Sequence, residues 1–423
     1  WGGALVVGLV VVLFARLSEL AGNAFMQLYH WHRLVPLLLT PLGGMAVVYA
    51  VRRWFLGAEG SGIPQVIAAI SQSEAGGATS RLLSLRIALG KVVLGAAAVG
   101  VGFSAGREGP SVQVGASLMH ALRRFLPKGH GTVPAHLILA GGAAGIAAAF
   151  NTPLAGILFA IEELSRRFEH KTNGVLLTAI VLAGLVSISL QGNYLYFGNF
   201  AVSTVDSRII LPVLACGLIC GVVGGLFARG LLWTLQPWPG TLGKLRANHP
   251  IWFAGACGLL VAVVGIITQG DAFGSGYGIT RTMLAHPDDV PATFALGKIL
   301  ATMASFFSGI PGGIFAPSLS IGAGIGHDLI PLLGQALSPA GIYALCMAAF
   351  LAAVTQAPIT AFIIVMEMID GHEMVLSLIA ASLIASLTSK LFCRPLYHAL
   401  AERQVALAQA AQAAADAQKK TAP

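Results

Sequence analysis

Residues 106–110, Gly-Arg-Glu-Gly-Pro, end the apolar run at residues 87–105. They place Arg107 and Glu108 where the chain is expected to lie at membrane depth. A charged side chain there costs about 3 kcal/mol or more, so it marks a candidate functional site. The glycines and the proline predict a helix break, because proline suits the first turn of a new helix. The positive N-terminal end of that helix, from Ser111 onward, predicts an anion site with a carboxylate already in it.

The composition predicts an integral membrane protein. Its 423 residues are 56% hydrophobic and 10% charged, with a mean hydropathy of +0.80, whereas soluble domains carry about 25% charged residues. Long apolar stretches recur along the chain, and Gly or Pro interrupts many of them. We therefore expect an all-α fold with more helices than stretches, some of them tilted and some broken.

The polar residues exclude several classes of partner. The net charge is +8, but the basic residues form short clusters between apolar runs, which is typical of loops beside lipid headgroups and not of a nucleic-acid site. The five cysteines and eleven histidines show no disulfide framework or metal spacing. We expect no metal and no cofactor. Because residue 1 is Trp, we expect the natural chain to begin earlier.

An internal repeat relates two halves of the chain. An offset of 207 carries Lys91 onto Lys298 and Pro110 onto Pro317. Duplicated halves with helix breaks at matching places predict a transporter whose site lies between the halves near the middle of the membrane. Inverted topology is a frequent arrangement for such a site.

The repeat also predicts the division of the chain. Gly-Ser-Gly occurs at residues 60–62 and again at residues 274–276. We expect a first transmembrane half at residues 1–205, a second at residues 206–400 and an aqueous C-terminal tail at residues 401–423.

Two further breaks and one tyrosine carry candidate anion-binding groups. Ser61 lies in Gly-Ser-Gly-Ile-Pro at residues 60–64, which is either a loop turn or a helix break that exposes N–H groups and a hydroxyl. Residues 312–317, Gly-Gly-Ile-Phe-Ala-Pro, repeat the charged break without its charges. They form either a packing turn or the second wall of one site. Tyr397 follows the last long apolar run, where tyrosine usually anchors a chain at the membrane surface.

Two adjacent acids follow another proline. At a second offset of 205, Pro153 falls on Pro358 and Glu162 on Glu367. Glu162 either begins a solvated helix face or has a role within the fold. The counterpart of Glu163 is a methionine, so the repeat itself does not require an acid there, which favours a task specific to the first half.

Together and in order, residues 60–64, residues 106–110, residues 313–317 and Tyr397 resemble the CLC family of chloride channels and proton-coupled chloride transporters. The resemblance covers nearly the whole chain. It implies a homodimer with one pathway per subunit, each subunit being built from two inverted halves. It also implies a bacterial-type, multi-pass protein of the cell inner membrane that handles chloride and protons in the lipid bilayer.

The resemblance further implies an anion site. A central chloride would be held by the hydroxyl groups of Ser61 and Tyr397 and by the backbone N–H groups of Ile314 and Phe315. Ser61 matches the chloride-preferring members, whereas fluoride-preferring branches tend to differ there.

The two acids match functional positions of the family. Glu108 matches the gating glutamate, and Glu163 matches the internal glutamate that passes protons in the exchangers. The channel branch usually lacks the internal acid, so the resemblance favours chloride/proton exchange. The backbone N–H groups of Gly106 and Arg107 would face an anion once Glu108 has moved away.

Other functions are open to the same residues. A passive chloride channel, gated by voltage or pH, would use the same pore, with Glu108 as its gate and no role for Glu163. A fluoride exporter would need different chemistry at Ser61. An enzyme is not expected, because no nucleophile–base pair or metal-ligand cluster stands out in the sequence.

Overall fold

The computed structural model describes residues 1–75, 77, 79, 81–125, 134–165, 173–192, 197, 209–285, 293–333, 336–369 and 371–421. These residues form 18 α-helices and no β-strand, which confirms the all-α prediction. The helices outnumber the apolar stretches because Gly and Pro divide several stretches in two, as in the run that contains Pro358.

The first half of the chain supplies helices whose lengths differ widely. Their bounds are α1 (Gly2–Trp31), α2 (Pro36–Trp54), α3 (Ile63–Glu74), α4 (Leu85–Gly100), α5 (Glu108–Leu122), α6 (Pro134–Phe150), α7 (Pro153–Phe159) and α8 (Asn173–Gln191). A short 3₁₀ turn, η1 (Arg123–Phe125), follows α5, and a π-helical turn, η2 (Ala160–Ser165), continues α7.

The second half repeats this mixture of long and short helices. Their bounds are α9 (Ile210–Leu232), α10 (Gly240–Asn248), α11 (Pro250–Ile267), α12 (Tyr277–Ala285), α13 (Phe294–Ser308), α14 (Phe315–Leu333), α15 (Pro339–Thr355), α16 (Pro358–Ile369), α17 (Val375–Ser389) and α18 (Leu396–Thr421). Two 3₁₀ turns, η4 (Trp233–Leu235) and η6 (His372–Met374), lie between them.

The chain is a multi-pass membrane protein. Five helices in the described part are long and apolar enough to cross a bilayer, at Gly2–Trp31, Gly174–Gln191, Ile210–Leu235, Pro250–Ile267 and His372–Ser389. Several of the remaining apolar helices have 12 to 17 residues. A span takes about 20 residues, so the shortest of these helices, such as α16 with 12 residues, are too short to cross a bilayer on their own.

Glycine allows equivalent helices of the two halves to pack closely. A Cβ at Gly115 of α5 would collide with the carbonyl of Gly141 of α6, and a Cβ at Gly322 of α14 would collide with the carbonyl of Cys346 of α15. Gly115 and Gly322 are related by the offset of 207. The repeat thus preserves a backbone-to-backbone approach that membrane helices obtain from small residues.

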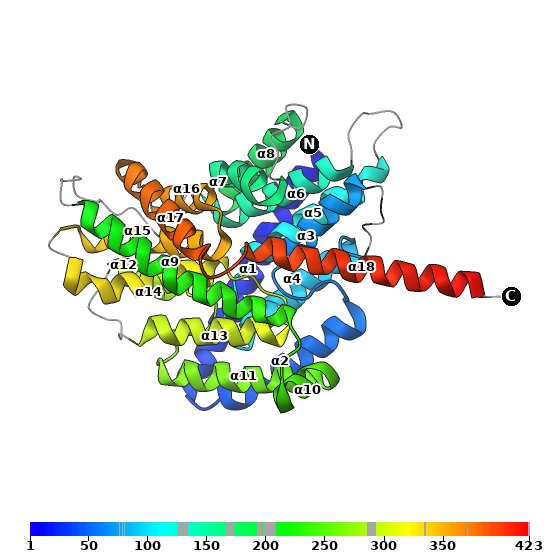
Figure 1. Cartoon of the computed structure of the whole chain (residues 1–423), viewed down its shortest axis with the longest axis horizontal. Helices are drawn as coiled ribbons and strands as arrows, with labels where there is room; N and C mark the ends of the chain where they lie inside the picture. The colour runs from blue at the N-terminus through cyan, green and yellow to red at the C-terminus, as the bar shows by residue number, and fades with distance from the viewer. Residues whose placement is uncertain are drawn as a thin grey trace.

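The last helix leaves the bundle. Figure 1 shows that α18 begins among the other helices and that its C-terminal part extends away from them. It runs from Leu396 to Thr421 without interruption, so position 400/401, where we expected the tail to begin, lies inside a helix. The predicted boundary at 205/206 lies outside the described residues, and the division into 1–205, 206–400 and 401–423 stays a prediction.

Candidate functional site

The charged stretch forms the break between α4 and α5. Helix α4 ends at Gly100 and α5 begins at Glu108, three residues before the Ser111 start that we expected. Glu108 is therefore in the first turn, where the unpaired N–H groups of a helix favour a negative charge. Its side chain is buried, and Arg107 occupies the position just before the helix.

The Glu108 carboxylate folds back over the break. A side chain at Gly106 would collide with Glu108 Oε2, and its Cβ would also lie 3.2 Å from Ala316 Cβ and 3.2 Å from Pro317 Cδ. The carboxylate therefore lies beside the first turn of α14. The N-terminal ends of α5 and α14, which come from different halves of the chain, meet at this carboxylate.

Backbone hydrogen bonds join the breaks of the two halves. The N–H of Gly106 donates to the carbonyl of Gly313 at 2.8 Å, and the N–H of Gly313 donates to the carbonyl of Gly106 at 2.7 Å. The N–H of Gly60 donates to the carbonyl of Ile310 at 3.0 Å, and the N–H of Gly312 donates to the carbonyl of Gly60 at 3.0 Å. These four bonds fix the relative position of three helix starts without using a side chain.

Two buried hydroxyl groups face this meeting point. Ser61 is 3% exposed and Tyr397 is fully buried, and among the described residues neither hydroxyl meets a hydrogen-bonding group apart from the other hydroxyl. A Cβ at Gly109, in the first turn of α5, would collide with Ser61 Oγ. The Tyr397 hydroxyl lies next to the Ser61 hydroxyl. It is also close enough to the carboxyl groups of Glu108 and Glu163 to interact with them electrostatically. Buried hydroxyls with no other partner suit a dehydrated anion, which accepts hydrogen bonds.

The second wall of the site is the start of α14. The first hydrogen bond of this helix runs from the N–H of Ser318 to the carbonyl of Ile314 at 2.8 Å, so the N–H groups of Ile314 and Phe315 precede the intrahelical ladder. The Phe315 ring stacks on the Tyr397 ring, with a centroid distance of 5.9 Å and an interplanar angle of 15°. This stacking holds the Tyr397 hydroxyl near the N-terminal end of α14.

The repeated lysines support the Gly-Ser-Gly loops. Buried Lys91 donates from Nζ to the carbonyls of residues 58–60 at 2.7 to 3.1 Å, and buried Lys298 donates to the carbonyls of residues 272–274 at 2.8 to 3.2 Å. An ammonium group has three donors, so each lysine is fully engaged by backbone. Helix α4 begins at Leu85, where the Ser84 hydroxyl caps it by accepting from the N–H of Ile87, so Lys91 lies inside the helix.

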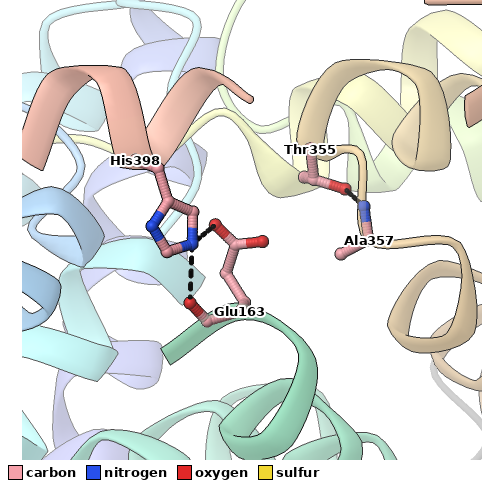
Figure 2. Close-up of polar contacts among 4 residues, drawn as sticks. All are labelled: Glu163, Thr355, Ala357 and His398. Atoms are coloured by element: carbon pink, nitrogen blue, oxygen red, sulfur yellow. Dashed lines mark hydrogen bonds and ion pairs between the residues drawn. The ribbon is translucent and has the colours of Figure 1, made fainter. Parts of the chain in front are cut away.

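Glu163 lies on the π-helical turn η2, with 1% of its side chain exposed. Isolated π-helical turns are frequent at functional sites. Figure 2 shows that His398 of α18 points at this residue. His398 Nε2 lies 3.1 Å from the Glu163 carbonyl oxygen and 3.8 Å from Glu163 Oε1. The sequence did not single out His398, since its spacing matches no motif and only the fold brings it near an acid 235 positions earlier.

Glu162 has a role within the fold and does not begin a solvated face. Its carboxylate accepts from the N–H groups of Ile359 and Thr360 at 3.1 and 2.6 Å, at the start of α16. In return, Glu367 of α16 accepts from the N–H groups of residues 154 and 155 at 3.2 and 2.8 Å, at the start of α7. The α7–η2 segment and α16 are therefore antiparallel, and each caps the other.

A cavity of about 570 Å³ reaches the charged break. Its lining includes exposed Arg16 and Glu19 of α1 as well as Arg107, Glu108 and the second Gly-Ser-Gly loop. The cavity therefore connects the surface of the protein with the buried carboxylate. In the described residues, no group of three or more His, Cys, Asp or Glu side chains is placed to hold a metal ion.

The predicted site residues gather around helix starts from both halves. Ser61 precedes α3, the residues from Gly106 to Glu108 begin α5, Ile314 and Phe315 begin α14, and Tyr397 begins α18. Glu163 lies on η2, apart from the helix starts, and is close enough to the Tyr397 hydroxyl to interact with it electrostatically.

The chain is similar in sequence and in structure to known ion-transport proteins. Residues 43–390 match the family described as voltage gated chloride channel. The chain is 31% identical over 403 residues to an H(+)/Cl(-) exchange transporter ClcA of Klebsiella pneumoniae, covering 91% of this chain and 82% of that protein. It is also similar to the crystal structure of a slow cyanobacterial Cl⁻/H⁺ antiporter, with a TM-score of 0.81, 26% identity and coverage of 96% and 97%. The structure of a CLC-type fluoride/proton antiporter gives a TM-score of 0.75 at 25% identity, with coverage of 92% and 94%.

Proposed function

The chain belongs to the voltage-gated chloride channel family, and from this premise we propose that it exchanges chloride for protons across a membrane, with Glu108 as its gate. The observation that carries the proposal is the buried Glu108 carboxylate, folded back between the N-terminal ends of α5 and α14. The carboxylate carries the same negative charge as chloride and occupies the place between the two helix ends that suits a chloride ion.

Chloride binds in this proposal without a full positive charge. Each helix N-terminus supplies about half a unit of positive charge, and the hydroxyls of Ser61 and Tyr397 donate hydrogen bonds. The ammonium of Lys91 is turned to backbone carbonyls and does not face the anion. Permeation needs a site that also releases its ion, so partial charges suit transport better than a buried cation.

Competition between chloride and Glu108 links the two ions. The ionised carboxylate and chloride repel each other and claim the same helix ends, so arrival of chloride favours protonation of Glu108. The neutral acid then leaves the site and opens the N-terminal end of α5, with the N–H of Arg107, to an anion. The N–H of Gly106, which we expected to face the anion as well, donates to the Gly313 carbonyl at 2.8 Å and takes no part. Return of the carboxylate after proton release closes the pathway.

Glu163 delivers protons from the inside in this proposal. An acid that is 1% exposed is costly to keep in a membrane protein and is by default a functional candidate. A passive channel would give it no task, so its burial favours exchange over the channel alternative.

The test is proton movement in liposomes that contain the purified protein, driven by a chloride gradient. We expect the wild-type protein to pump protons uphill. Glu108→Gln and Glu163→Gln should abolish proton pumping while chloride still flows. Chloride flux without proton movement in the wild type would leave a channel, and fluoride flux that exceeds chloride flux would favour a fluoride exporter.

We also propose a homodimer in the cell inner membrane, with one pathway per subunit. Helices α8 and α17 expose large apolar side chains, among them Val181, Leu185, Leu383 and Leu387, which need either lipid or a second copy as cover. The mass of the detergent-solubilised protein, corrected for bound detergent, is expected to be twice 43.6 kDa. A single-copy mass would contradict the dimer without affecting the exchange proposal.

A further inference from the structure

We propose that His398 relays protons between the aqueous solution and Glu163. This inference rests on the proposed exchange function and adds a residue to it.

The position of His398 carries the inference. Its side chain is 22% exposed, whereas that of Glu163 is 1% exposed, so the imidazole stands between solvent and the buried acid. A carbonyl oxygen only accepts hydrogen bonds, so the 3.1 Å contact between His398 Nε2 and the Glu163 carbonyl places a proton on Nε2. In the neutral ring Nδ1 is then the proton acceptor, and it points away from Glu163 (Figure 2).

The two ring nitrogens divide the transfer into two steps. A proton from solvent adds to Nδ1 and gives the imidazolium ion. The Nε2 proton then passes to Glu163 Oε1, now 3.8 Å away, when the carboxylate turns to hydrogen-bond distance or one water bridges the gap. The products are a neutral ring protonated at Nδ1 and a neutral acid. Loss of the Nδ1 proton to solvent and uptake of a solvent proton at Nε2, as the ring turns, restore the starting tautomer. The reverse sequence carries a proton outward from the acid.

Imidazole suits this task because it gains and loses a proton near pH 6.5 when unperturbed, closer to neutrality than any other side chain. The acids around it are engaged elsewhere. Glu162 caps α16, and Glu402, one turn along α18, lies 3.9 Å from Arg394 on the exposed surface. Among these groups Glu163 is the acid within 4 Å of the ring.

The start of α18 brings the two ions together. Tyr397 offers its hydroxyl to the anion site, and the next residue, His398, contacts the proton acid. The first turn of α18 therefore contacts both the anion site and Glu163. A movement of α18 driven by anion binding would also change the distance between His398 and Glu163.

The experiment compares His398→Gln and His398→Ala with the wild type in liposomes, recording proton and chloride flux together. Glutamine keeps an N–H donor for the Glu163 carbonyl but cannot take up a proton. We expect both variants to lower the number of protons moved per chloride at least about tenfold, with chloride flux retained. Imidazole added to the buffer should restore proton flux in His398→Ala, where the ring has left space. His327→Gln, which changes a histidine bonded to Tyr343 at 3.2 Å, is the matched control and should keep the wild-type ratio.

The outcomes separate the two proposals. A wild type that moves no protons refutes exchange itself. If the wild type moves protons and His398→Gln keeps its ratio, His398 only holds the Glu163 carbonyl and the relay is refuted. Loss of proton flux in both variants without rescue by imidazole also overturns the relay. Retained chloride flux reports correct folding, and if the alanine variant does not fold, the glutamine variant decides the question.

Discussion

Ser61 and Tyr397 pose the simplest test at the scale of single residues. Both hydroxyls are buried and meet no hydrogen-bonding group of the described residues apart from each other, and a hydrogen bond to a charged group contributes about 1.5–3 kcal/mol. We expect Ser61→Ala and Tyr397→Phe each to weaken chloride binding about tenfold or more, measured by isothermal titration calorimetry. Tyr343→Phe removes a buried hydroxyl that is bonded to His327 and should leave the affinity unchanged. Wild-type affinity in both site variants would place the anion elsewhere.

The two lysines give a second prediction, because the repeat supplies its own control. Lys91→Met and Lys298→Met each leave three loop carbonyls without their donor. Leaving a buried acceptor without its donor costs about 1–3 kcal/mol, so both variants should unfold at lower temperature or denaturant concentration. The loop of Lys91 carries Ser61, so only Lys91→Met should also weaken chloride binding. Equal losses of affinity in both variants would contradict a local role for Lys91.

At this scale the sequence singled out most residues of the candidate site but not the groups that support them. Charge at membrane depth predicted Glu108, and the repeat singled out Lys91. The partners of Lys91 are backbone carbonyls, which every residue has, so no sequence pattern indicates them. His398 was missed for a similar reason, since its contact with Glu163 depends on how α18 packs against η2.

At the scale of elements, the reciprocal caps between α7–η2 and α16 predict different roles for two adjacent acids. Glu162→Ala removes two charge-assisted hydrogen bonds from a helix start, and loss of a cap costs about 1–2 kcal/mol. We expect lower stability with the wild-type ratio of protons to chloride. Glu163→Gln should show the opposite, normal stability and lost proton movement. Unfolding in detergent and liposome flux measure the two effects, and exchange of the two phenotypes would refute the assignment.

The caps can also be tested against each other. Glu367→Ala removes the matching pair of bonds at the start of α7, and both caps hold the same two helices together. Because the helices are already loosened after the first change, the double variant Glu162→Ala/Glu367→Ala should lose less stability than the sum of the single losses. Strict additivity would mean that each cap acts only on its own helix.

The helix breaks were predictable because Gly, Pro and charge leave a local record, as at residues 106–110. The capping was not predictable in the same way. The offset of 205 related Glu162 to Glu367, but each acid bonds to backbone N–H groups about 200 positions away. A repeat shows that two positions are equivalent and does not show that they lie in contact.

At the scale of the whole molecule, neither predicted half contains the complete candidate site. Ser61 and Glu108 come from the first half, whereas Ile314, Phe315 and Tyr397 come from the second. The bonds between Gly106 and Gly313 and the reciprocal caps lie between the halves. Each half also contains helices of 12 to 17 residues. Residues of the other half form hydrogen bonds at the starts of several of these helices.

This arrangement predicts the behaviour of a divided chain. If the chain is cut at the predicted boundary and residues 1–205 and 206–423 are produced separately, neither piece should bind chloride, because each holds one wall of the site. Produced together in one cell, the pieces should assemble and recover exchange, because the contacts that complete the site are non-covalent. Co-purification and calorimetry with chloride measure assembly and binding. Glu162→Ala and Glu367→Ala should reduce the yield of assembled pieces more than that of the intact chain, since only the pieces depend on these contacts for association. Chloride binding by one piece alone would show that a single half holds a sufficient site.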